Sequence, residues 1–423
     1  MRISVVGGGY VGLVTSTCLA KLGHSVILIE VDEHKVDAIN SGIPFIYEEG
    51  LRELLSAHIG KNIIASTSYR DLSSSDFTLI CVGTPSLPDG RADLSIIEAA
   101  SFSIGQCLID KEGYHVVAVK STVPPGTTQN LIMPKILSQS GKHENEIGFV
   151  MNPEFLREGL AVQDFMKPDR IVIGSSDERA GDTVQSAYCG IDAPILRTGL
   201  TAAEMIKYAS NAFLASKISF SNEIGNVCKK LGIDVYEVLR GVGMDHRISP
   251  HFFNAGLGFG GSCFPKDVSA LIRLAEDMDE DPILLRSVVE VNERQPMRIV
   301  ELLLRRFRDL SGKRVAILGL AFKNDTDDVR ESRAIPVIRE LLRRGASVVA
   351  YDPKAVLSMR NVVPDIEYCE GASQALTDAD ACLVLTEWPE FGQLDKEFEL
   401  MRSRVIIDGR RVLSCENVEG ICW

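Results

Sequence analysis

The chain opens with a short apolar run followed at once by spaced glycines. Ile3 to Val6 has the composition of a buried β-strand, and Gly7-Gly8-Gly9-Tyr10-Val11-Gly12 follows with the spacing G-x-G-x-x-G. Residues 13–22 continue as a predicted helix. In such a unit the first glycine makes the turn, the second admits a pyrophosphate, and the third lets the helix approach the strand. The pattern predicts a Rossmann-type domain that holds dinucleotide phosphates at the amino end of the helix.

An acidic residue ends the next predicted strand. Residues 26–29 are apolar and are followed by Glu30. At this position a carboxylate accepts hydrogen bonds from the adenosine ribose and repels a 2′-phosphate. Glu30 therefore favours NAD over NADP as the cofactor.

Length and charge limit the remaining possibilities. A chain of 423 residues is too long for a single core, so we expect two or three domains. Its 45% hydrophobic and 24% charged residues are ordinary for a globular protein. The formal charge of −13 argues against broad binding to nucleic acid or to anionic membranes.

The cysteines and the first residues indicate the compartment. The ten cysteines form no C-x-x-C pair and no Cys/His ligand spacing, so we expect no metal site and a reducing cytoplasm. The first strand follows Met1 directly, which leaves no room for a signal peptide. No apolar run approaches the length of a transmembrane helix.

The first part of the chain alternates predicted strands and helices, as a parallel α/β sheet requires. Two of the strand candidates run into the loops Gly83-Thr84-Pro85 and Ser121-Thr122-Val123-Pro124-Pro125-Gly126. Ligands collect at the carboxyl ends of such strands. We expect an NAD-binding domain over residues 1–200. Its later strand candidates are residues 77–82, 116–119, 149–151 and 171–174.

A sequence pattern typical of helices begins at Thr201. Thr201 and Glu204 have the spacing of a capping box, in which each side chain satisfies the other's free amide. The helical pattern runs to Leu231, and Gly232 is a natural stop. Another helix is expected from Asp281-Pro282 toward Arg308. Residues 201–305 are predicted to form a helical middle domain.

The α/β pattern returns at Lys313 and predicts a second Rossmann-like domain over residues 306–423. Its first loop, Gly319-Leu320-Ala321-Phe322-Lys323, lacks the three spaced glycines, so we expect no second dinucleotide there. Lys323 and Arg330 supply positive charge that suits a nucleotide diphosphate. The sequence predicts an α/β protein with two Rossmann-like parallel-sheet domains joined by a helical middle domain. The expected strands are residues 314–319, 347–351, 381–385 and 405–408, with a helix over residues 333–344.

One cysteine lies in a glycine-rich loop, Gly258-Phe259-Gly260-Gly261-Ser262-Cys263-Phe264-Pro265-Lys266-Asp267. A nearby lysine favours the thiolate, which is the nucleophilic form. Most cysteines are small buried hydrophobes, so the loop alone would not decide the question. Together with a nicotinamide site, a nucleophilic Cys263 permits oxidation of an alcohol through an aldehyde to an acid.

The whole chain resembles the UDP-glucose/GDP-mannose dehydrogenase family, and most closely its branch that acts on UDP-glucose. The likeness rests on GGGYVG, CVGTP, STVPPGT, NPEFLREG, GFGGSCFPKD and FKNDTDDVRES, and on the pair Lys207 and Asn211. It implies a four-electron oxidation of a sugar C6 alcohol to a carboxylate with two NAD molecules, converting UDP-glucose to UDP-glucuronate. A UDP-sugar is the expected substrate. The residues around the cysteine, Ser262-Cys263-Phe264, resemble the UDP-glucose branch.

The resemblance also assigns catalytic roles. Cys263 attacks the aldehyde, the resulting thiohemiacetal is oxidised to a thioester, and water hydrolyses the thioester. Lys207 and Asn211, four positions apart on one helix, stabilise the oxyanion. The groups matching those that position or activate water are Asp267, Thr122, Glu154 and Glu158.

Binding positions follow in the same way. Arg247 resembles an arginine that reaches a neighbouring subunit's substrate, and Glu49 stands where the family usually has proline. The predicted cofactor-binding residues are Gly7, Gly9, Val11, Gly12, Glu30, Lys35, Thr84, Thr122, Glu158, Lys266 and Arg330. The predicted substrate-binding residues are Glu154, Phe155, Leu156, Arg157, Glu158, Lys207, Asn211, Arg247, Phe252, Phe253, Asn254, Ala255, Gly256, Gly260 and Lys323.

Three alternatives stay open on the sequence. The same chemistry could act on GDP-mannose or another UDP-hexose. A two-electron hydroxyacid or 6-phosphogluconate-type dehydrogenase shares the layout but would not need Cys263. A non-catalytic nucleotide-sugar-binding module would yield no NADH at all. For assembly, the long helix from Thr201 must bury an apolar face, so we expect a homodimer or a higher homo-oligomer.

Overall fold

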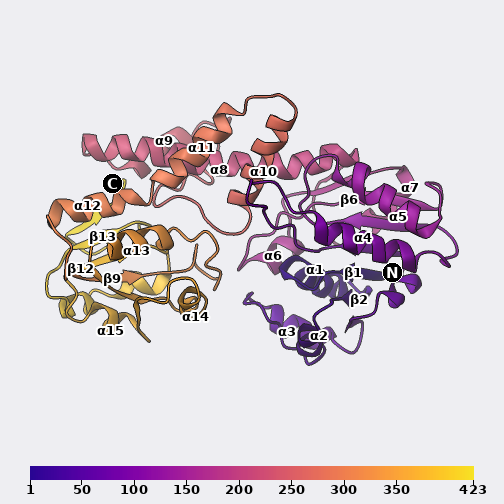
Figure 1. Cartoon of the computed structure of the whole chain (residues 1–423), viewed down its shortest axis with the longest axis horizontal. Coiled ribbons are helices and arrows are strands. Elements are labelled where there is room, and N and C mark those ends of the chain that lie inside the picture. The colour runs from indigo at the N-terminus through magenta and orange to yellow at the C-terminus, as the bar shows by residue number, and fades with distance from the viewer. The chain divides into compact units, whose positions relative to one another are not determined.

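The computed structural model describes residues 1–423 and divides into two compact units, Met1–Ser210 and Asn211–Trp423 (Figure 1). Each unit contains one sheet. The longest helix, α8 (Leu200–Leu231), begins in the first unit and ends in the second. The α/β class with two Rossmann-like sheets and a helical middle region is confirmed. The predicted boundaries near residues 200 and 305 stay a prediction.

The first unit is built on an eight-stranded sheet of order β3-β2-β1-β4-β5-β6-β7-β8. All neighbouring strands are parallel except β6 and β7, which pair antiparallel, so the sheet is not purely parallel. The order reverses between β1 and β4, which is where a doubly wound sheet binds its ligand. The strands are β1 (Arg2–Val6), β2 (Ser25–Ile29), β3 (Ile63–Ser66), β4 (Phe77–Ile80), β5 (His115–Val119), β6 (Ile147–Met151), β7 (Ile171–Ser175) and β8 (Ile195–Thr198).

Two apolar clusters cover the two faces of this sheet. Alternate residues of β1 point to opposite sides, so Ile3 and Val5 join the cluster containing Leu13 of α1, whereas Val6 joins the cluster containing Ile104 of α4. The helices are α1 (Tyr10–Lys21), α2 (Glu33–Asn40), α3 (Leu51–His58), α4 (Ser95–Cys107), α5 (Met133–Ser140), α6 (Ala161–Met166) and α7 (Glu178–Ala187), with short turns at Tyr69–Ser74 and Thr128–Ile132.

The second unit contains a six-stranded, fully parallel sheet of order β11-β10-β9-β12-β13-β14. This order matches the first six strands of the other sheet. The strands are β9 (Arg314–Leu318), β10 (Ser347–Tyr351), β11 (Glu367–Tyr368), β12 (Ala381–Val384), β13 (Ile406–Asp408) and β14 (Val418–Gly420). The accompanying helices are α13 (Ala334–Arg343), α14 (Val356–Arg360) and α15 (Ala372–Leu376), with short turns at Pro389–Gln393 and Glu397–Leu400.

The start of α8 differs from the predicted capping box. The helix begins at Leu200, and the amide of Ala203 donates to the Gly199 carbonyl at 3.1 Å, so Thr201 lies inside the first turn. The Glu204 carboxylate accepts from the amides of Gly126 and Thr128 at 2.5 and 2.8 Å. Glu204 therefore holds the loop after β5 in place. The predicted stop is confirmed, because α8 ends at Leu231 and Gly232 has a φ of 71°.

The remaining helices of the second unit surround the cysteine loop. They are α9 (Val235–Gly243), α10 (Phe264–Asp277), α11 (Ile283–Arg294) and α12 (Met297–Arg306). The single helix expected from Asp281 toward Arg308 is wrong, because the segment breaks at Gln295-Pro296 into α11 and α12. Proline lacks the amide that would continue α11 and clashes with the preceding turn. None of the helices is both long and apolar enough to cross a bilayer.

Candidate active-site residues

The glycine-rich turn has the geometry expected for dinucleotide phosphates. Gly7 has a φ of 101°, and a Cβ on Gly12 would lie 1.8 Å from the Gly7 carbonyl oxygen, so α1 can approach β1 only with glycine at position 12. Gly9 immediately precedes α1 and has open space where a side chain would be. Exposed backbone at the amino end of a helix is the arrangement that binds phosphate. These residues fit the predicted cofactor.

Glu30 follows β2 and is nearly buried, with 8% of its surface exposed. Its carboxylate accepts from the amides of Gly8 at 2.8 Å and Asp32 at 3.1 Å. The Asp32 side chain caps α2 and accepts from the Lys35 amide, while the Lys35 ammonium lies 5.1 Å from the centre of the Phe45 ring. Glu30 and Lys35 therefore lie at the carboxyl end of β2, where the ribose is expected.

Two predicted loops meet at the ends of β4 and β5. The hydroxyl of Thr84 donates to the Thr122 carbonyl at 2.7 Å. Thr84 is buried and Thr122 is partly exposed. The structure thus brings the CVGTP and STVPPGT motifs together at the carboxyl edge of the first sheet.

A buried ion pair joins the loop after β6 to α8. Lys207 Nζ lies 3.0 Å from Glu154 Oε1, and the two side chains are 4% and 7% exposed. Glu154 Oε2 also accepts from the Leu156 amide at 2.6 Å. Burial raises the pKa of Glu154, but Lys207 and the Leu156 amide outweigh it and the pKa lies below its ordinary value. Glu154 is therefore an ionised carboxylate, able to accept a proton from water.

The rest of the NPEFLREG loop is also anchored. The guanidinium of Arg170 stacks 3.8 Å from the centre of the Phe155 ring. Arg157 is exposed, and both its amide and its guanidinium donate to Asp164, at 2.8 Å and 2.7 Å. Arg157 is thus engaged with α6, and Glu158 is partly buried beside it.

In the second unit, Cys263 occupies the N-cap position of α10, with Pro265 in the first turn. The partial positive charge at the amino end of a helix stabilises an anion such as a thiolate. The Ser262 hydroxyl lies 3.5 Å from Cys263 Sγ. A helix start directly at the cysteine was not part of the sequence prediction, although Pro265 in the first turn is a signal that could have indicated it.

Asp267 lies one turn into α10 and is 1% exposed. The Asn211 amide donates to its Oδ2 at 2.6 Å, and Lys266 Nζ donates to its Oδ1 at 2.5 Å. The Asp267 amide donates to the Cys263 carbonyl at 2.9 Å. Four predicted site residues, Asn211, Cys263, Lys266 and Asp267, are therefore brought together.

Buried polar side chains that sequence reasoning missed hold residues 255–259. Asn292 accepts from the Phe259 amide at 2.7 Å and donates back to the Phe259 carbonyl at 3.0 Å. Gln295 donates to the Gly256 carbonyl at 2.8 Å, and Asn222 accepts from the Gly256 amide at 2.7 Å. An asparagine amid the apolar residues of Val288-Val289-Glu290-Val291-Asn292 was the available signal. These three side chains shape the predicted sugar-nucleotide loop.

The cysteine loop also contacts the FKNDTDDVRES segment. The Gly261 amide donates to the Arg330 carbonyl at 3.0 Å. The Arg330 guanidinium is exposed and pairs with Asp328 at 2.5 Å, and Lys323 Nζ donates to the Asn324 carbonyl at 3.2 Å. The cysteine loop therefore contacts the backbone of residue 330, while the guanidinium of Arg330 lies at the surface beside Asp328.

Arg247 is the predicted residue least connected to the others. Its guanidinium is 77% exposed and pairs with Asp245 at 2.6 Å. Phe253 is buried, and Lys217 Nζ lies 4.2 Å from the centre of its ring. Phe252 packs edge-on against Phe264, with ring centres 5.9 Å apart. The aromatic part of the predicted substrate loop is thus packed, while Arg247 projects outward.

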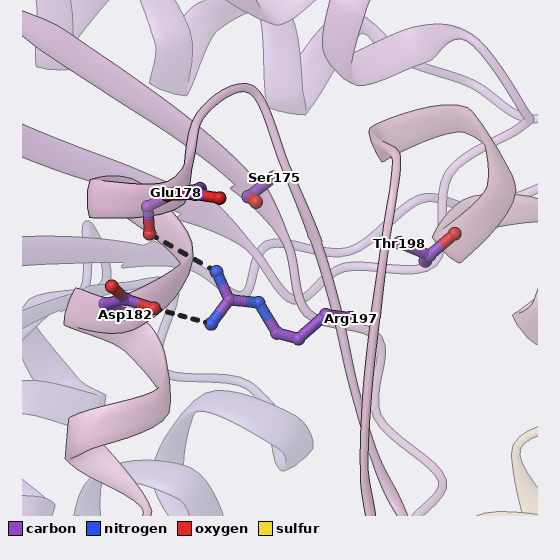
Figure 2. Close-up of a pocket in the computed structure, with 5 residues that line it drawn as sticks. All are labelled: Ser175, Glu178, Asp182, Arg197 and Thr198. Carbon is purple, nitrogen blue, oxygen red and sulfur yellow. Dashed lines mark hydrogen bonds and ion pairs between the residues drawn. The ribbon is translucent and has the colours of Figure 1, made fainter.

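A surface hollow in the first unit contains none of the predicted site residues. It has a volume of about 580 Å³ and lies over α7 and the ends of β7 and β8. Figure 2 shows that Arg197 points across it toward Asp182 and Glu178. Arg197 donates to the Asp182 carboxylate at 2.8 Å and to the Glu178 carbonyl at 3.2 Å. The single cation that lines the hollow is therefore already paired with protein groups.

Three family models together match most of the chain. All belong to the UDP-glucose/GDP-mannose dehydrogenase family. The NAD binding domain matches residues 1–192, the central domain residues 201–294, and the UDP binding domain residues 316–415.

Full-length relatives agree with these matches. The chain is 48% identical over 420 residues to the UDP-glucose 6-dehydrogenase AglM of Haloferax volcanii, covering 98% of this chain and 97% of the relative. It is 42% identical to the UDP-glucose 6-dehydrogenase TuaD of Bacillus subtilis, covering 99% and 91%. The solved structure of a UDP-glucose dehydrogenase from Pyrobaculum islandicum is 44% identical, with a TM-score of 0.94 and coverage of 100% and 98%.

Proposed function

Because the chain belongs to the UDP-glucose/GDP-mannose dehydrogenase family, we propose that it oxidises the C6 alcohol of UDP-glucose to the carboxylate of UDP-glucuronate. The overall reaction consumes one alcohol, two NAD⁺ and one water, and yields one carboxylate, two NADH and three protons. The names of the full-length relatives support UDP-glucose as the sugar nucleotide.

One observation carries the mechanism: Cys263 stands at the amino end of α10, one turn before the buried Asp267. In the proposed reaction the thiolate attacks the aldehyde carbon, a C–S bond forms, and the carbonyl electron pair moves to oxygen. Loss of a hydride from this thiohemiacetal gives a thioester. Water then attacks the thioester, the C–S bond breaks, and the thiolate is regenerated. Covalent capture prevents escape of the aldehyde between the two oxidations.

The first domain is the NAD-binding domain of the family. Gly7, Gly9 and Gly12 would hold the pyrophosphate at the start of α1, and Glu30 would hold the adenosine ribose. When bound, NAD accepts one hydride in each of the two oxidations. The fit of these residues rests on the close approach at Gly12 and the open backbone at Gly9.

Oxyanion stabilisation and water activation are assigned to the charged and amide side chains. Lys207 supplies a cation and Asn211 an amide donor for the developing alkoxide. The charge of Lys207 and the Leu156 amide hold Glu154 ionised despite its burial, and the carboxylate suits the role of general base in thioester hydrolysis. Thr122, Glu158 and Asp267 are proposed to position the water.

The C-terminal domain is the UDP-binding domain of the family. Lys323 and residues 252–256 are proposed to bind the sugar nucleotide, with Gly260 close to them in the loop. The buried amides of Asn222 and Gln295 support this assignment, because they fix the backbone at Gly256.

A stoichiometric assay tests the proposal. Purified protein should form two NADH per UDP-glucose, measured by absorbance at full conversion, with little free aldehyde. A ratio of one NADH per sugar with accumulating aldehyde would exclude the thioester route and favour a two-electron dehydrogenase. A complete absence of NADH formation would favour a non-catalytic binding module.

The competing sugar nucleotides form a second test. Initial rates with UDP-glucose, UDP-N-acetylated hexoses and GDP-mannose should be highest for UDP-glucose by at least tenfold in kcat/KM. A higher value for another sugar would reassign the substrate within the same chemistry.

We also propose a cytoplasmic homodimer or higher homo-oligomer. Phe213, Phe220 and Val227 recur every seven residues on α8 and are 67%, 50% and 53% exposed, so they form one apolar stripe. The exposed Arg247 would then serve the partner's substrate. Light scattering should report at least a dimer, and Phe220→Asp should shift it to a monomer. A fully active wild-type monomer would contradict this assembly.

A further inference from the structure

Glu48 joins segments of the first unit that lie far apart in the sequence. It is in the loop between α2 and α3 and is only 7% exposed. Its Oε2 accepts from the Tyr10 hydroxyl and from the Gly159 amide, the latter at 2.8 Å. Its Oε1 accepts from the Ala161 amide at 2.7 Å. One buried carboxylate thus receives three hydrogen bonds from two other segments.

Both segments belong to the predicted active site. Tyr10 is the first residue of α1 and directly follows Gly9 of the phosphate turn. Gly159 directly follows Glu158, at the end of the loop that also carries Glu154. The Gly159 amide is shared, since it also donates to the Tyr10 hydroxyl at 2.9 Å. Glu48, Tyr10 and Gly159 therefore form a closed triangle of hydrogen bonds.

The hydroxyl of Tyr10 is a permanent donor in this triangle. Burial and then the hydrogen bond to Glu48 raise the pKa of Tyr10, and the nearby charge of Glu158 acts in the same direction. The phenol therefore stays protonated throughout the working pH range.

The role of Glu48 is not explained by its own segment. The cap of α3 is Gly50, and Glu48 contributes only its backbone carbonyl to that helix, accepting from Leu51 at 3.3 Å. The other carboxylates of this region anchor different parts of the loop, because Glu154 contacts Leu156 and Lys207, and Asp164 accepts from Arg157. Glu48 reaches this loop from more than 100 residues away in the chain.

We propose that Glu48 is a positioning residue, which fixes the end of the 152–160 loop against the start of α1 and so aligns Glu158, the residue before Gly159, with the dinucleotide. The inference rests on the proposed function, since it assigns Glu48 to the same reaction. Hydrogen bonds from amides to a buried carboxylate are strong and directional, which suits this role. Misplacement of a catalytic group by a fraction of an ångström is enough to slow turnover severalfold.

Glu48→Gln nearly preserves the side-chain volume. It breaks the contact because the NH2 group of the new amide faces a backbone N–H and cannot accept its hydrogen bond. Glu49→Gln is the matched control, since the neighbouring Glu49 is exposed and undergoes the same chemical change. Hydrogen–deuterium exchange of the ligand-free protein should show at least tenfold faster exchange at Gly159 and Ala161 in Glu48→Gln. Glu49→Gln should match the wild type. Unchanged protection in Glu48→Gln would overturn the proposal.

A double-mutant cycle on kcat separates positioning from general destabilisation. Glu48→Gln should lower kcat about tenfold in the wild-type background and less than twofold in a Glu158→Gln background, because it acts through Glu158. An equal loss in both backgrounds would overturn the proposal. UDP affinity, measured by calorimetry, should stay within twofold in every variant.

Tyr10→Phe provides the same test if Glu48→Gln folds poorly. It removes one donor without leaving a buried charge bare, and should lower kcat about threefold with the same dependence on Glu158. Additivity with Glu158→Gln would contradict the proposal. If wild-type protein forms no NADH from UDP-glucose, both the proposed function and this inference are wrong. If it forms two NADH per UDP-glucose but the losses in kcat are additive with Glu158→Gln, only the inference is wrong.

Discussion

The sheets of the two units place a glycine at the same point but surround it differently. In each sheet the first strand, β1 or β9, lies between its second and fourth strands and is followed by a glycine, Gly7 or Gly319. These glycines have φ values of 101° and 98°, and their amides donate at 2.8 and 2.9 Å to the last carbonyl of the neighbouring strand. A Cβ would lie 2.9 Å from Cys81 in the first case and 2.5 Å from Thr386 in the second.

The acidic residues that follow β2 and β10 diverge. Glu30 accepts from two backbone amides, at 2.8 and 3.1 Å. Asp352 accepts from the four amides of Leu320, Ala321, Lys354 and Ala355, and from the indole of Trp388 at 3.0 Å. A carboxylate has about four acceptor sites, so Asp352 is saturated by protein whereas Glu30 retains capacity for a ligand.

The segments after the glycines diverge as well. In the first sheet α1 begins at Tyr10, so its free amides face the turn, whereas in the second sheet no helix begins before Ala334. The same strand order therefore supports a dinucleotide site in one sheet and a different nucleotide site in the other. The two sheets differ in the segments that follow Gly7 and Gly319, and in how many acceptor sites of Glu30 and Asp352 remain free for a ligand.

The largest expected effect is on turnover, and it should come from removing the sulfur of Cys263 in the second unit while the cofactor site of the first unit is left intact. Cys263→Ser should lower turnover by at least about 1000-fold, because an alcohol is a far weaker nucleophile than a thiolate. Affinities for NADH and UDP should stay within twofold in calorimetry. The variant should also remain impaired when the UDP-sugar aldehyde is supplied.

Cys18→Ser is the control for this prediction. Cys18 is buried in α1, and burial raises the pKa of its thiol to about 12, so it is a packing residue. It should lower stability with turnover within twofold of wild type. Near-normal activity of Cys263→Ser would make Cys263 a packing residue too.

The saturated carboxylate should matter mainly for stability. Asp352→Asn places an amide group against buried N–H donors, and should cost about 3 kcal/mol of unfolding free energy. Urea unfolding of the second unit measures the cost. A loss below about 1 kcal/mol would show that Asp352 is not saturated as described.

Acid should weaken the first unit through His115. Burial lowers the pKa of His115 to about 3, so the folded unit holds it neutral while the unfolded chain protonates it near its usual value. Stability from this group is present above about pH 6.5 and is lost as pH falls toward 3. Between pH 7.5 and 5, wild type should lose about 2 kcal/mol more than His115→Gln in hydrogen exchange of the first unit. Equal losses would contradict a neutral buried His115.

Glu30, which accepts only two hydrogen bonds from the protein, should matter mainly for cofactor choice. Glu30→Gln keeps the hydrogen-bonding length but removes the charge that repels a 2′-phosphate. The ratio of kcat/KM for NAD over NADP should fall about tenfold, which corresponds to about 1.4 kcal/mol. Stability should fall by about 1–2 kcal/mol, less than in Asp352→Asn, because only one backbone amide loses its acceptor. An unchanged ratio would refute the role of Glu30.

The sequence predicted the two sheets and most of their strands, because short apolar runs ending in glycine or acidic residues are local signals. It also predicted the residues that gather around Cys263. It was wrong at Thr201, because α8 begins at Leu200 with the Gly199 carbonyl accepting from Ala203, and Glu204 binds the loop after β5. It missed Asn292 and Glu48, whose partners are backbone groups distant in the chain. Such tertiary contacts have no local pattern.

Partial burial was also beyond the sequence. Cys18 and Cys81 are buried, whereas Cys107 is only partly buried at the end of α4. The spacing of apolar residues places a side chain on a face and does not tell how completely that face is covered.

We propose that the first sheet alone binds the dinucleotide, while the second unit binds the sugar nucleotide. Calorimetric titration of NADH and then UDP into the full-length protein tests it most directly, with Gly12→Val as the comparison, because its side chain would collide with the Gly7 carbonyl. Wild type should bind one NADH and one UDP per chain, and Gly12→Val should lose at least 100-fold in NADH affinity with UDP affinity within twofold. Two NADH sites per chain, or loss of both ligands in Gly12→Val, would contradict this division of the two ligands between the units.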